Sequence, residues 1–180
     1  MITIKNMERI KSMNYVLCAL LVVLGVVSRF IDHAPNFTPI LSIAIMSSMY
    51  IKNRWVFLIP ISIMFISDLF IGSHIMAPWI YFSILIICLL AYSAKNNISN
   101  IFLYSIVGSI IFFIISNFGV WLSGGYTHSL EGLILCYTMA IPFFKNTLMS
   151  TSLFSILIFV LYNTINLIVK RRKSDKILDY

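Results

Sequence analysis

The sequence predicts an all-α integral membrane protein, a bundle of six transmembrane helices with an outer-side half-helix or hairpin before the last span. Two observations predict this class. The 180 residues are 60% hydrophobic and 11% charged, with a mean hydropathy of +0.96, which lies outside the composition of soluble globular domains. The apolar residues also form separate runs of roughly membrane-spanning length. Six spans leave no room for a second domain, so residues 1–180 are predicted to form one membrane domain.

Six apolar runs predict the spans, and short polar stretches separate them. They cover residues 13–31, 38–51, 55–71, 78–94, 101–122 and 144–169. The second run is too short for an ordinary vertical span, so it is either a short helix or a span completed by its neighbours. Pro60 in the third run predicts a kink. The further stretch 130–143 begins with Glu131 and ends near Pro142, which favours an outer half-helix over a crossing.

The cations predict the orientation. Eleven of the thirteen Lys and Arg residues fall on one side of a six-span arrangement, and they are Lys5, Arg9, Lys11, Lys52, Arg54, Lys95, Lys170, Arg171, Arg172, Lys173 and Lys176. The positive-inside rule makes that side cytoplasmic, so we expect a multi-pass protein of the cytoplasmic (inner) membrane with both termini inside. The first run is longer than the apolar part of a signal peptide, which predicts a retained N-terminus. Cations that flank apolar runs do not indicate nucleic-acid binding.

Two cations, Arg29 and Lys145, fall on the predicted outer side. An ionisable group inside a bilayer costs about 2.5 to 3.5 kcal/mol at a helix centre, so each such group needs a partner or a function. Asp68 lies about one turn inside the third run. An ion pair with Arg29 or Lys145 explains a carboxylate at this depth as well as a ligand-binding role does.

Polar and aromatic residues gather at the same predicted outer level. Phe113, Asn117 and Trp121 share a helix face by their i, i+4 spacing. Asn117 could therefore orient a ligand on which Trp121 stacks, although an interhelical bond and an interfacial Trp fit equally well. Breaks in the helical pattern at 35–39 and 142–145 suggest an outward-open cavity.

The predicted solute-binding residues therefore come from several outer segments. They are Arg29, Asp32, His33, Asn36, Thr38, Asp68, Asn117, Trp121, Tyr137, Lys145 and Asn146. Charged groups beside aromatic faces suit a small heterocyclic or zwitterionic solute. The stripe Thr147, Thr151 and Ser155 is interpreted as a surface for close helix packing. We expect no catalytic residue, no cofactor and no metal ion.

Four ordered motifs carry a resemblance over residues 25–155. They are PNFTPI at 35–40, SDL at 67–69, NFGVW at 117–121 and IPFFKNTL at 141–148. These motifs resemble an uncharacterised family of small bacterial integral membrane proteins, which in turn is similar to the substrate-binding S components of energy-coupling factor vitamin transporters. The resemblance implies six helices, an ordered first outer loop, a ligand pocket near the outer face, and energy-coupling transmembrane and ATPase subunits as partners. S components commonly carry small docking residues four apart on the first helix, whereas here Ala19 is followed by Val23.

The leading functional hypothesis is uptake of a micronutrient-sized solute. A stand-alone proton-coupled transporter is the nearest alternative, with Asp68 or Glu131 as the proton site. An intramembrane enzyme is the rival of a different class, with a metal or acid/base site formed by His33, His74, His128, Asp68 and Glu131. The three His residues, however, lie on three loops without a recognised metal-binding spacing. A membrane partner or assembly factor that does not transport is a further alternative, which an outer cavity filled with bulky side chains would favour.

Overall fold

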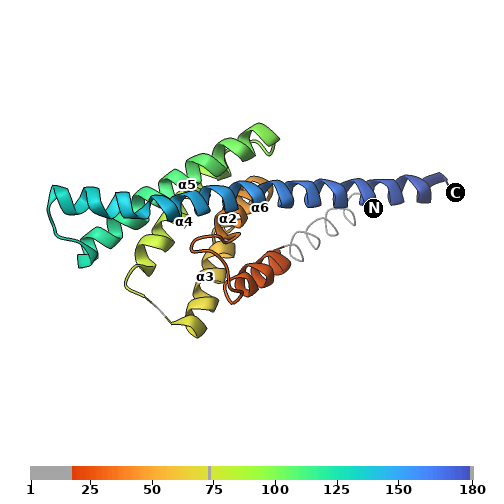
Figure 1. Cartoon of the computed structure of the whole chain (residues 1–180). Helices are drawn as coiled ribbons and strands as arrows, with labels where there is room; N and C mark the ends of the chain where they lie inside the picture. The colour runs from red at the N-terminus through yellow and green to blue at the C-terminus, as the bar shows by residue number, and fades with distance from the viewer. Residues whose placement is uncertain (1–17, 73, 179–180) are drawn as a thin grey trace.

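The computed structural model describes residues 18–72 and 74–178, and within that part of the chain every regular element is helical. The order is a Cys18–Ser28 helix, α2 (Ile40–Tyr50), α3 (Leu58–Ile71), α4 (Ala77–Tyr92), α5 (Ile98–Val120), the π-helical turn η1 (Trp121–Gly125) and α6 (Leu130–Leu178) (Figure 1). These helices coincide with the predicted apolar runs to within a few residues, apart from the last. Residues 13–17 of the first predicted span, with the cations Lys5, Arg9 and Lys11, lie outside the described residues.

The short helix α2 forms the centre of the bundle. All of its residues from Ile40 to Met49 are buried, and it contacts α3, α4, α5 and α6. A helix that is apolar around its whole circumference is expected to be buried in this way. Its 11 residues extend only about 17 Å, at 1.5 Å per residue. The second apolar run is therefore a short buried helix, which is one of the two readings that the sequence allowed.

The first turn of α3 contains Pro60, so the expected kink at this residue is wrong. The helix begins at Leu58, which places Pro60 in the turn whose backbone N–H groups have no intrahelical acceptor. The ring therefore removes no hydrogen bond from the helix. The Cys18–Ser28 helix packs closely on α3. At Gly25 the two helices are so close that an added Cβ atom would meet the side chain of Ile63.

The hairpin of α5 and α6 is the longest part of the molecule, and its turn lies away from α2 and α3 (Figure 1). Asn97 caps α5 by accepting a hydrogen bond from the backbone N–H of Asn100. The turn uses Gly124 at a φ of 84°, a left-handed conformation that glycine adopts without steric cost.

The expected break at 142–145 is wrong, because α6 continues through Pro142 as one helix of 49 residues. The predicted half-helix 130–143 and the last predicted span 144–169 are therefore a single element. Contacts with α5 explain why the two segments remain aligned. The Tyr137 hydroxyl donates to the carbonyl of Ile114 before the proline, and the Phe144 ring packs on Phe113 after it.

Two of the described helices are long and apolar enough to cross a membrane. These are Ile98–Gly125, which joins α5 to η1, and the segment Leu130–Ile168 of α6. The other four described helices are apolar but shorter. Large hydrophobic side chains are exposed along the outward faces of the bundle, among them Leu89, Phe102 and Leu161.

Candidate functional site

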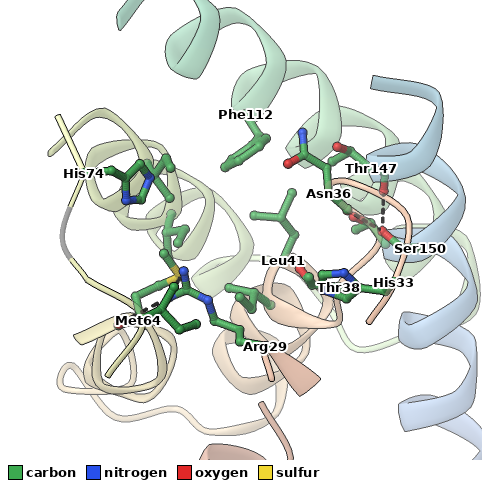
Figure 2. Close-up of a pocket in the computed structure, with 15 residues that line it drawn as sticks. Arg29, His33, Asn36, Thr38, Leu41, Met64, His74, Phe112, Thr147 and Ser150 are labelled. Atoms are coloured by element: carbon green, nitrogen blue, oxygen red, sulfur yellow. Dashed lines mark hydrogen bonds between the residues drawn. The ribbon is translucent and has the colours of Figure 1, made fainter. Parts of the chain in front are cut away.

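A cavity of about 310 Å³ lies at the end of the bundle where the Cys18–Ser28 helix leads into α2. Five helices, α2 to α6, and two connecting segments surround it, and Figure 2 shows the polar side chains that point into it. Its lining consists of Arg29, His33, Asn36, Thr38, Ile40, Leu41, Met64, Ile71, His74, Ile80, Ile84, Phe112, Thr147, Ser150 and Thr151. Four of the predicted binding residues are in this list, namely Arg29, His33, Asn36 and Thr38.

An ion pair holds Arg29 at the edge of the cavity. The Nη1 atom of Arg29 donates to Oδ1 of Asp68 at 2.6 Å and to the hydroxyl of Ser67. The second carboxylate oxygen, Oδ2, accepts from the Tyr81 hydroxyl at 2.8 Å. Of the two ion-pair partners predicted for Asp68, Arg29 is confirmed, while the Lys145 side chain is exposed on α6. Asp68 supports the cavity from behind Arg29 and is not part of its lining.

The loop of residues 29–39 covers the cavity and is fastened to α6. Asn36 has a φ of 63°, a left-handed conformation that Asn tolerates better than most residues. The side-chain amide of Asn146 donates to the Pro35 carbonyl at 3.0 Å, and the Ser150 hydroxyl donates to the Asn36 carbonyl at 3.4 Å. The predicted break at 35–39 is confirmed, and Asn146 acts there as a tether outside the lining.

The floor of the cavity is formed by polar side chains of α6 opposite an aromatic ring. Thr151 has no exposed surface, and its hydroxyl has no hydrogen-bond partner among the described residues. Buried polar groups in proteins are nearly always paired, so an unpaired hydroxyl on a cavity wall indicates a place for a bound water or ligand atom. The Phe112 ring enters between His74 and Asn36 in the view of Figure 2.

Three other predicted binding residues lie on the α5–α6 hairpin and do not line the cavity. The Asn117 amide donates to the carbonyl of Phe113 in its own helix, and the Tyr137 hydroxyl donates to α5. The Trp121 indole donates to the Thr127 carbonyl at 3.0 Å. Asp32 and Lys145 are exposed and are also absent from the lining. A binding role for these residues stays a prediction.

Sequence reasoning missed several lining residues, which are Met64, Phe112, Thr147, Ser150 and Thr151. Thr147 and Thr151 were interpreted as a packing stripe, and Thr151 is indeed completely buried. A signal was present, because Thr147, Ser150 and Thr151 follow one another at the i, i+3, i+4 spacing that shares one helix face. His74 lines the cavity with His33, while His128 packs against Trp121. Among the residues whose side chains are described, 18–72 and 74–168, no group of three His, Cys, Asp or Glu side chains could hold a metal ion.

Over the described residues, the fold and this site define an all-helical bundle that has two helices fit to cross a membrane and a small, partly polar cavity at one end. The chain belongs to a family of unknown function, DUF6580, which matches residues 9–174. No curated protein and no solved structure matches it. Membership of an uncharacterised family is thus confirmed, while the similarity to S components stays a prediction.

Proposed function

We propose that this chain is a membrane transport protein that binds a small micronutrient-like solute, such as a vitamin or a heterocyclic precursor, in the cavity beneath the loop of residues 29–39. The cavity itself is the observation that carries the proposal. Its volume of about 310 Å³ lies at the lower end of the range for small-molecule sites. Its wall combines apolar side chains with polar groups that can orient a solute. No catalytic step is required for this function.

The membrane arrangement that goes with this proposal has six helices in the inner membrane, both termini in the cytoplasm and the cavity facing outward. Two long apolar helices and the exposed hydrophobic side chains of the bundle support it. The charge distribution supports the orientation, because Lys52, Arg54 and Lys95 lie in connections between helices that do not line the cavity.

Energy for uptake would come from separate coupling subunits, as in S-component systems. The alternative is a proton-coupled transporter that works alone, for which Asp68 is a candidate proton site. Both oxygens of Asp68 are hydrogen bonded, one to Arg29 and one to Tyr81, which favours a supporting role for this carboxylate. Uptake by liposomes that contain this chain alone, driven by a pH gradient, would instead support the alternative.

Native mass spectrometry of gently purified protein tests the proposal. We expect the wild-type chain to carry a co-purified small molecule in addition to lipid. Ser150→Leu, which places a larger side chain on the cavity wall, should lose it. Ser152→Leu is the matched control, because Ser152 lies on the same helix and outside the lining. A wild-type chain that carries only lipid, or equal occupancy of the two variants, would contradict the proposal.

A further inference from the structure

We propose that the solute is a small carboxylate with an apolar or aromatic body, held at its carboxylate by Arg29. This inference rests on the proposed function, and it specifies the chemical class of the ligand. Three features of the cavity carry it, namely the charges on its wall, the unused hydrogen-bonding groups of Arg29, and the unpaired hydroxyl at its floor.

The charged and titratable groups on the cavity wall favour an anion. Arg29, His33 and His74 line the cavity, and no Asp or Glu is among its lining residues. Asp68, which pairs with the lining residue Arg29, has both oxygens engaged by Arg29 and Tyr81. A solute ammonium group would thus meet only neutral oxygen atoms, whereas a carboxylate would meet a guanidinium and two imidazoles that can donate N–H groups.

One edge of the Arg29 guanidinium, formed by Nε and Nη2, makes no hydrogen bond to the described residues. Every hydrogen bond that its guanidinium makes to the described residues uses Nη1, with Met64, Ser67 and Asp68 as acceptors. The Nε and Nη2 atoms have no partner among those residues, although the Arg29 side chain is only 14% exposed. A guanidinium edge with two parallel N–H groups matches the two oxygens of a carboxylate. The bonds through Nη1 hold this edge in place, which lowers the ordering cost of binding.

The rest of the wall fits an apolar body with a second acceptor. The Phe112 ring with Leu41, Ile80 and Ile84 forms an apolar surface on which a ring can pack. The Thr151 hydroxyl is buried and unpaired, so an acceptor atom of the solute that reaches it removes the cost of an unsatisfied polar group. The predicted ligand therefore has a carboxylate at one end and a single hydrogen-bond acceptor further along.

Fluorine NMR with two isosteric probes tests this inference. The probes are 4-fluorobenzoate and 4-fluorobenzamide, which differ in charge and have nearly the same shape, added to the wild-type chain in nanodiscs. We expect the benzoate to bind at least about tenfold more tightly, which corresponds to about 1.4 kcal/mol. The double variant Arg29→Gln/Asp68→Asn removes both charges together, so that no unpaired buried charge remains. It should abolish the preference by lowering the affinity for the benzoate to that for the amide.

Thr151→Val supplies a second variant that retains the shape of the side chain. The ligand for this variant is 4-pyridinecarboxylate, whose ring nitrogen is an acceptor opposite the carboxylate. We expect the variant to bind it about fivefold or more weakly than the wild-type chain does, as measured by its displacement of 4-fluorobenzoate, and to lose less affinity for benzoate, which has no such acceptor. Equal binding of benzoate and benzamide by the wild-type chain, a charge preference that survives the double variant, or no binding of either probe would overturn the inference. A neutral co-purified solute in native mass spectrometry would overturn it and leave the proposed function in place.

Discussion

Arg29 and Asp68 form an ion pair with an N–O distance of 2.6 Å, which joins the end of the first described helix to α3. The sequence separation between the two residues is large, and Tyr81 of α4 adds a third element through its bond to the same carboxylate. This small network fixes the position of the one guanidinium that lines the cavity. Its disruption should therefore affect both stability and binding.

Asp68→Asn should destabilise the protein by about 3 kcal/mol, because it leaves the mostly buried Arg29 without its counter-ion. The double variant Arg29→Gln/Asp68→Asn should lose much less, since two neutral amides can bond to each other. Thermal unfolding of both variants in the same detergent checks this. If the double variant is as unstable as Asp68→Asn, the ion pair is not the source of the loss.

Gly119→Ala should weaken the contact between α5 and α4. A Cβ atom at this position would lie 2.7 Å from the Cβ atom of Trp79 and closer still to its ring, so the helices must separate. We expect a loss of about 1 to 3 kcal/mol in the free energy of unfolding. Gly108→Ala is the control, because its Cβ would meet the end of the Ile45 side chain at 3.2 Å, which can move. A larger loss for Gly108→Ala than for Gly119→Ala would contradict the packing described here.

Asn146→Ala should loosen the loop that covers the cavity, because it removes the bond to the Pro35 carbonyl. We expect the backbone amides of residues 34 and 36–38 to exchange with deuterium about fivefold faster, as the loss of one hydrogen bond worth about 1 kcal/mol implies. Asn163→Ala is matched in residue type and helix, and the Asn163 amide donates to the Phe159 carbonyl of the same helix and not to the loop. Exchange that is unchanged in Asn146→Ala, or equally fast in both variants, would show that α6 does not restrain the loop.

The continuity of α6 through Pro142 can be measured with spin labels. Leu135→Cys and Met149→Cys place labels at two exposed positions, in a background without Cys18, Cys88 and Cys136. For one continuous helix, 14 residues correspond to about 21 Å along the axis, with a narrow distribution of distances. A broad or much shorter distribution would indicate the break that the sequence suggested.

The helices were largely predictable from the sequence, because apolar runs and charged connections determine where a helix can be buried. The break at Pro142 was not a safe prediction, since its outcome depends on contacts of Tyr137 and Phe144 with α5. A single-helix pattern contains no information about such contacts between elements.

The site was predictable only where adjacent residues in the sequence remain neighbours in space. Asn36 and Thr38 lie on one loop together with Arg29 and His33, and all four line the cavity. Asn117 and Trp121 were grouped with them by their shared outer level. Sequence position gives the depth of a residue along a helix and says little about which side of the bundle it faces. Asn117 lies beside α6, where its carbonyl accepts from Cys136, and Trp121 of η1 donates to the Thr127 carbonyl.

The central claim is that the cavity beneath the loop binds a solute from outside the cell, and labelling of Ser150→Cys in intact cells tests it most directly. In the cysteine-free background, a membrane-impermeant thiosulfonate should modify Ser150→Cys without permeabilisation. It should also modify the loop control Ala34→Cys, because Ala34 is exposed and does not line the cavity. Asn53→Cys, on the opposite connection, should react only after permeabilisation. The co-purified solute should slow the reaction at Ser150→Cys and leave Ala34→Cys less affected. Labelling of Ser150→Cys only from the cytoplasmic side, or labelling that the solute does not slow, would contradict the account.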